Sequence, residues 1–123
     1  MKASSCPGFP CRISLEDAPI GEDVLLVNFE HHAVMSPYRS TYAIYVRPDV
    51  RQAAPYKSAL PPILWNRPIA IRAFDAEGML IGADLGKNEM LPEKIDRLLD
   101  VKGAQYLHLH NAMHGCYAAS VMR

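Results

Sequence analysis

Only one segment of this chain has the periodicity of an amphipathic helix, and this restricts the folds that it can adopt. Residues 92–100, PEKIDRLLD, begin with a proline suited to a first helical turn and an acidic residue suited to the positive end of the helix dipole. Gly103 lies just past the segment, where a left-handed cap belongs. Apolar side chains recur at the spacing i, i+4, i+7, i+8 of a buried stripe: Leu91, Ile95, Leu98 and Leu99. We therefore expect one well-defined helix at about residues 92–100.

The other apolar segments are short and are bounded by glycine, proline or polar residues, which favours strands. Residues 69–75 and 79–84 predict a β-hairpin, with Gly78 at a left-handed position of its turn. Residues 23–30, DVLLVNFE, suit a strand that is buried on both faces, and the following HHAVMSPYRS predicts a connection. Further strands are expected at residues 42–47, 106–110 and 116–122. The pattern predicts an α+β fold, a mostly antiparallel sheet of six or seven strands with the helix packed on it.

Composition argues against several functional classes. The chain has 123 residues, half of them apolar, which predicts a single compact domain over residues 1–123 with residues 1–10 as an irregular lead-in. Thirteen basic residues balance thirteen acidic ones, which argues against a nucleic-acid partner. No apolar run approaches the roughly 20 residues that span a bilayer, so no membrane partner is expected. Three cysteines without an apolar signal region predict reduced thiols in the cytoplasm, and a homo-oligomer is open but not indicated.

Three histidines and a cysteine lie within the segment YLHLHNAMHGCY. Alternation along a strand places His108 and His110 on one face and Leu107 and Leu109 on the other. We expect the leucines to face the core and the histidines to face solvent or a groove. Both histidines could then reach one metal ion, with a third ligand from elsewhere in the hairpin.

The register of that hairpin decides whether Cys116 can join the histidines. If His110 lies opposite Cys116, the thiol shares the histidine face; if Asn111 lies opposite Cys116, the thiol lies on the leucine face. His114 is the other candidate for the third ligand. No acidic residue lies nearby to orient a histidine, and the spacing matches no paired zinc knuckle. From the sequence we therefore expect no bound metal and no cofactor.

Five segments in order along the chain resemble the bacterial family known as domain of unknown function 1203. They are GFPCR (8–12), EDVLLVNF (22–29), PYRSTYAIYV (37–46), IRAFDAEG (71–78) and HLHNAMHGCY (108–117). The resemblance implies that the following residues occupy motif positions: Pro10, Cys11, Arg12, Pro37, Tyr38, Arg72, His108 and Cys116. It carries no activity. Ser14 and Ala119 stand where relatives often have cysteines, and His110 stands where arginine is common, which weakens a catalytic role for His110.

The motif positions predict a site if the first strand lies beside the last. A concave region would then be lined by Cys11, Arg12, His108 and Cys116, with Tyr38 and Arg72 contributing. The first hypothesis is a small-molecule binding module in which Arg12, Arg39 and Arg72 select an anionic group. Its apolar walls would come from Tyr38, Tyr45 and Trp65.

Two alternatives remain open. A protein–protein interaction domain without enzymatic activity would use an exposed strand edge or the proline-rich residues 54–68. A thiol enzyme, ranked third, would use Cys11 or Cys116 as the nucleophile and His108 as the base. The sequence offers no acidic third partner for that base, so it does not decide whether the protein is an enzyme.

Overall fold

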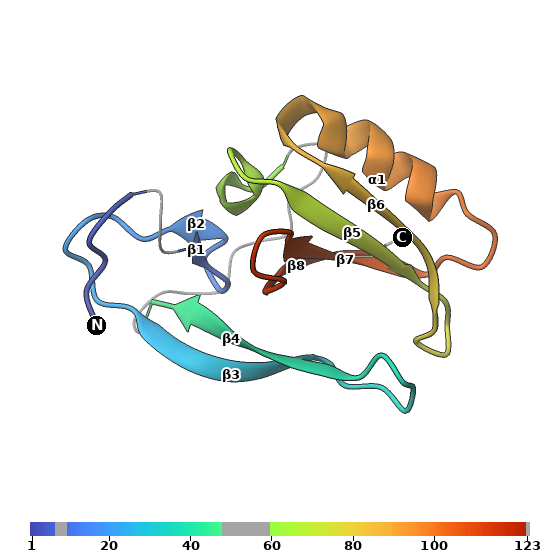
Figure 1. The fold of residues 1–123 in the computed structure, drawn as a ribbon, viewed down its shortest axis with the longest axis horizontal. Coiled ribbons are helices and arrows are strands. Elements are labelled where there is room, and N and C mark those ends of the chain that lie inside the picture. Colours follow the sequence, from blue (N-terminus) through green and yellow to red (C-terminus); the bar gives the residue numbers. More distant parts are fainter. Residues whose placement is uncertain (7–9, 48–59, 123) are drawn as a thin grey trace.

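The computed structural model describes residues 1–6, 10–47 and 60–122, and its strands form two four-stranded sheets (Figure 1). The first sheet has the order β2-β1-β4-β3, and the second has the order β6-β5-β7-β8. Strand bounds in the first sheet are β1 (Pro10–Cys11), β2 (Glu16–Asp17), β3 (Leu25–His32) and β4 (Ser40–Val46). Those in the second are β5 (Ile69–Phe74), β6 (Leu80–Gly86), β7 (Tyr106–Asn111) and β8 (Tyr117–Met122). Neighbouring strands are antiparallel, except that β1 and β4 are parallel.

The helix α1 (Leu91–Leu99) covers one face of the second sheet (Figure 1). Its buried side chains, from Leu91, Ile95 and Leu98, share one apolar core with Leu107 and Leu109 of β7. The helix predicted at residues 92–100 is thus confirmed to within one residue. Short 3₁₀ helices lie at Pro62–Leu64 and Asn88–Met90. None of the helices in the described residues is long and apolar enough to cross a membrane.

The α+β class is confirmed, but the expectation of one sheet with six or seven strands is wrong. Strands β3 and β4 form a hairpin, and the other edge of β4 pairs with the short β1 through Cys11 and Tyr45. This sheet ends at β2 and does not continue into the strands of the second sheet. Alternation along a strand identifies the side chains that share a face, whereas the pairing partner can lie anywhere in the sequence.

The expectation that residues 23–30 form a strand buried on both faces is also wrong. Strand β3 is the edge of the first sheet, and the side chains of Leu25 and Leu26 are 47% and 55% exposed. Only its end is covered: His32 is 3% exposed. A continuous apolar run is equally compatible with an exposed edge strand and a central one, because periodicity does not report the neighbours of a strand.

Residues 1–6 contain no helix or strand, yet backbone hydrogen bonds hold them against the segment before β3. Ala3 N donates to Glu22 O at 2.9 Å, and Val24 N donates to Met1 O at 2.8 Å. Ala3 and Val24 belong with Cys11 and Ala18 to a second, smaller core. The N-terminal segment therefore contributes to the packing behind the first sheet.

Candidate metal centre

Strand β7 is buried on both faces, although only one of them faces the helix. Leu107 and Leu109 pack under α1, as alternation predicts. His108 and His110 point to the other face and are only 6% and 0% exposed. The expectation that these histidines face solvent or a groove is therefore wrong, because the end of β3 in the first sheet covers them. Aromatic ring contacts from β3 to both histidines record this packing of sheet on sheet.

A bulge in β3 turns two consecutive histidines toward the second sheet. Phe29 lies opposite Tyr42 and His32 lies opposite Ser40, so β3 has one residue more than β4 over this stretch. Consecutive side chains of a regular strand point to opposite faces, and an extra residue changes that direction. As a result the rings of both His31 and His32 contact the ring of His108, with centroids 5.6 Å and 4.8 Å away.

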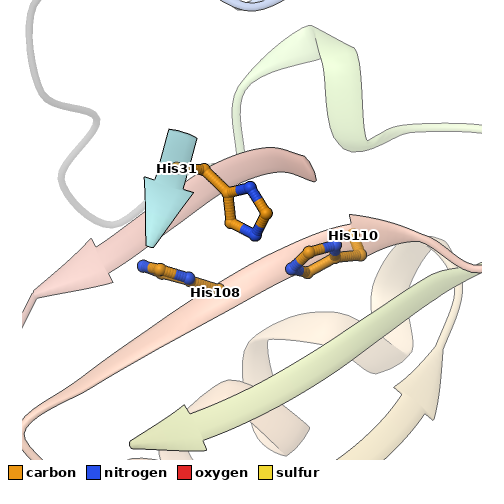
Figure 2. A group of neighbouring side chains, drawn as sticks. All are labelled: His31, His108 and His110. Carbon is orange, nitrogen blue, oxygen red and sulfur yellow. The ribbon is translucent and has the colours of Figure 1, made fainter. Parts of the chain in front are cut away.

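Three imidazole rings from the two sheets surround a common space (Figure 2). One ring nitrogen from each of His31, His108 and His110 lies within 4.8 Å of the other two. In a tetrahedral zinc site with Zn–N bonds of about 2.0–2.1 Å, ligand nitrogens lie about 3.3 Å apart. To reach that spacing, the nitrogens must approach one another by up to about 1.5 Å. The cluster therefore has the donor type and the spacing from which a metal site can assemble.

The hydrogen bonds of these rings leave buried nitrogens free to bind a ligand. His110 Nδ1 lies 2.8 Å from Gly115 O, and a carbonyl only accepts, so Nδ1 carries the proton and donates. The other nitrogen, His110 Nε2, is buried without a hydrogen-bond partner. Metal-bound histidines are commonly oriented by such a bond from the second nitrogen to a carbonyl.

Two further ring nitrogens of the cluster, His31 Nδ1 and His108 Nδ1, are also buried without a partner. Leaving a buried polar atom unsatisfied costs about 1–3 kcal/mol. Three such atoms in one cluster are therefore unusual for side chains that serve packing alone. An ion held by one nitrogen of each ring would satisfy those of the three that face it.

The protein holds these rings in the uncharged form that metal ligands require. Burial lowers the pKa of His108 to about 3, and repulsion from the neighbouring histidines and Arg72 adds to the shift. Burial also lowers the pKa of His31 to about 4, with the charges of His110 and His32 next in importance. The pKa of His110 is lowered chiefly by burial too, against the opposing effect of the Gly115 carbonyl. At neutral pH each ring thus has one nitrogen with a free lone pair and one N–H.

The adjacent His32 has both ring nitrogens engaged and supports the cluster from the side. Its Nδ1–H donates to Tyr38 O at 2.8 Å, and its Nε2 accepts from the Tyr106 hydroxyl at 2.7 Å. The ring of Tyr117 stacks on that of His31 at 4.8 Å. These contacts hold the rings of His31 and His32 in place beside the cluster.

Arg72 is a charged residue next to the cluster. It lies directly opposite His108 in the pairing of β5 with β7, which puts both side chains on one face of the second sheet. Its positive charge lowers the pKa of His31, His108 and His110. No hydrogen bond or ion pair joins Arg72 to any other described residue, and no described carboxylate is paired with the three histidines.

The residues predicted to form one site have different partners in the structure. Arg12 is used structurally, because its Nε donates to Tyr117 O at 2.8 Å and its terminal nitrogen donates to Pro10 O. Arg39 forms an exposed ion pair with Glu30 at 3.1 Å. The first strand pairs with β4 rather than with the last strand, contrary to the arrangement on which the predicted site depended. Of the predicted ligand-binding residues, Arg72 lies beside His108. Arg12 lies near Cys116, which acts on the pKa of Arg12.

The two predicted thiol nucleophiles are also separated from the histidines. Cys11 is fully buried in the smaller core, and burial raises the pKa of its thiol, the opposite of activation. At the closing hairpin His110 pairs with Tyr117, and Asn111 N donates to Cys116 O at 2.8 Å. This register puts Cys116 on the leucine side of the strand, the second of the two alternatives.

The sequence analysis missed His31. The histidine pair after DVLLVNFE was assigned to a connection, whereas β3 continues through His32. Two histidines at the end of an apolar strand were a usable signal, but their partners lie more than 70 residues later in the chain. Only the packing of the two sheets brings them to His108 and His110.

Comparison with known families agrees with the resemblance found in the sequence. The family model described as "Protein of unknown function (DUF1203)" matches residues 8–123, nearly the whole chain. No curated protein and no solved structure matches the chain.

Proposed function

This chain belongs to the DUF1203 family of proteins of unknown function, and we propose that it is a metal-binding domain that holds a divalent transition-metal ion through His31, His108 and His110. The observation that carries the proposal is the convergence of three neutral imidazoles in a cluster with three unpaired buried nitrogens. This departs from the sequence-based expectation of no metal, which considered only ligands within the last hairpin.

The donor set favours zinc and its neighbours in the first transition row. Imidazole nitrogens suit Zn²⁺, Cu²⁺, Ni²⁺ and Co²⁺, whereas Mg²⁺ and Ca²⁺ prefer oxygen ligands, which the cluster does not supply. Three protein ligands leave a fourth position of a tetrahedral ion open. Closed structural zinc sites use four protein ligands, so three histidines are more typical of a site that also binds an exogenous ligand.

The proposal concerns this chain rather than every member of its family. The resemblance places an arginine at the position of His110 in many relatives, and an arginine cannot bind the ion. A relative with that residue would lack the third ligand.

Isothermal titration of the full chain with ZnCl₂, after treatment with EDTA and buffer exchange, tests the proposal. We expect one equivalent of Zn²⁺ to bind, and Co²⁺ to give the visible absorption of a tetrahedral nitrogen site. His31→Gln, His108→Gln and His110→Gln should each weaken binding more than the about 10–100-fold typical of losing an outer-shell partner. His114→Gln is the matched control, because His114 is an exposed histidine in the same hairpin.

Circular dichroism on each variant separates loss of a ligand from loss of the fold. His31→Gln is the most informative variant, since His31 is less buried than the other two. Failure of the folded wild-type protein to bind Zn²⁺ or Co²⁺ would overturn the proposal. So would equal weakening by His31→Gln and His114→Gln.

A further inference from the structure

The proposed metal centre has more positive charge than its surroundings balance. Histidines that bind a metal are neutral, so a divalent ion on these three brings two positive charges. Arg72 adds a third on the same face of the second sheet. No described carboxylate forms an ion pair with Arg72 or a hydrogen bond with the three histidines. Charges that are partly removed from water are costly unless they are paired, so a loaded site requires an anion.

Arg72 is placed to supply the second half of an anion site. Cross-strand neighbours have Cβ atoms about 4.5–5.5 Å apart, which is well within the reach of an arginine side chain. The Arg72 side chain is half-buried rather than free in solvent, and none of the described residues holds its guanidinium in an ion pair. A planar guanidinium matches two oxygens of a carboxylate or a phosphate group. Within the described part of the chain, therefore, no hydrogen bond or ion pair occupies the Arg72 guanidinium.

We infer that the open coordination position of the metal binds an oxyanion, a carboxylate or phosphate group, with one oxygen on the ion and another on the Arg72 guanidinium. The inference rests on the proposed metal site and names its ligand class. Binding replaces the metal-bound water by an anionic oxygen and leaves all protein protons in place. An anionic ligand was also predicted from the sequence. Here Arg72 recognises it, because Arg12 and Arg39 already have structural partners.

Two neighbouring features restrict which oxyanions can enter. The rings of Tyr117 and Tyr42 flank His31, with centroids 4.8 Å and 5.4 Å away. Phe74 lies against His108 at 5.2 Å. Such walls favour a small anion or one that carries an apolar group, and they disfavour a bulky polyanion.

Visible spectroscopy of the Co²⁺-loaded protein tests the inference, with acetate and inorganic phosphate titrated in separate arms. We expect at least one of the two anions to change the d–d absorption in a saturable way. Arg72→Gln should lower the affinity for that anion by at least about tenfold, as expected for losing a hydrogen bond to a charged group. Arg72→Lys keeps the positive charge but lacks the planar guanidinium. Its affinity for the anion should lie between those of the wild type and Arg72→Gln. Arg97→Gln is the control, because Arg97 is an exposed arginine on α1.

The outcomes separate the inference from the function on which it rests. If Co²⁺ binds but neither anion changes the spectrum, or if Arg72→Gln and the wild type respond alike, the inference is wrong and the metal site stands. If Co²⁺ does not bind, both are wrong. A response to only acetate or only phosphate identifies which oxyanion the site takes.

Discussion

The burial of His108 should make the metal-free protein sensitive to mild acid. Its pKa is about 3 in the folded state, whereas its ordinary value is 6.5. Between these two pH values the histidine is protonated in the unfolded chain and neutral in the folded protein. The contribution of neutral His108 to the free energy of unfolding is fully present above pH 6.5. It is lost progressively as the pH falls from 6.5 toward 3. At pH 5.0 the difference is 1.5 pH units, or about 2 kcal/mol of unfolding free energy at 1.36 kcal/mol per unit.

Urea unfolding in EDTA at pH 7.5 and 5.0 measures this loss. The wild-type protein should lose at least about 2 kcal/mol between the two pH values, and His108→Gln should lose about 2 kcal/mol less than the wild type. His114→Gln should behave as the wild type. Should His108→Gln fail to fold, His31→Gln provides the same comparison, since the pKa of His31 is lowered to about 4. Equal losses in wild type and both variants would refute the reasoning that burial keeps these rings neutral.

Two further predictions test the fold around the site. Gly78→Ala should destabilise the protein by about 1–3 kcal/mol in urea unfolding, because Gly78 has φ +77° and the added Cβ would lie 2.8 Å from Val34 Cγ2; Gly21→Ala, with φ +87° and open space, should cost less, and an equal cost would contradict a steric contact. In the folded protein, iodoacetamide should modify the exposed Cys6 quickly and the buried Cys11 slowly, as followed by mass spectrometry, and fast modification of Cys11 would show that its core opens readily.

A metal at the proposed site would also tie the two sheets together. His31 comes from the first sheet, and His108 and His110 come from the second. In the metal-free protein this junction includes ring contacts and hydrogen bonds such as those of His32 with Tyr106 and of Arg12 with Tyr117 O. Because an ion that binds only the folded state stabilises it, Zn²⁺ would shift unfolding of both sheets together.

The sequence by itself determined the features that depend on residues close together in the chain: a helix, a turn and the alternation along a strand. The stripe of Leu91, Ile95 and Leu98 predicted α1, and Gly78 predicted a left-handed turn, which has φ +77° in the structure. Alternation correctly placed His108 and His110 on one face of β7. Each of these predictions depends on residues within a few positions of one another, where helix and strand periodicities are directly visible.

Only the tertiary structure decided which elements meet. The sequence did not show that β3 and β4 leave the main sheet, because a strand's own residues do not encode its hydrogen-bonding partner. It did not show that a bulge turns His31 toward the second sheet, or that the last hairpin adopts the register that moves Cys116 away. The candidate site depends on the first two, and the third excludes Cys116 from it. The sequence thus determined one face of the site through the alternation of β7, and the packing of one sheet on the other supplied its third histidine.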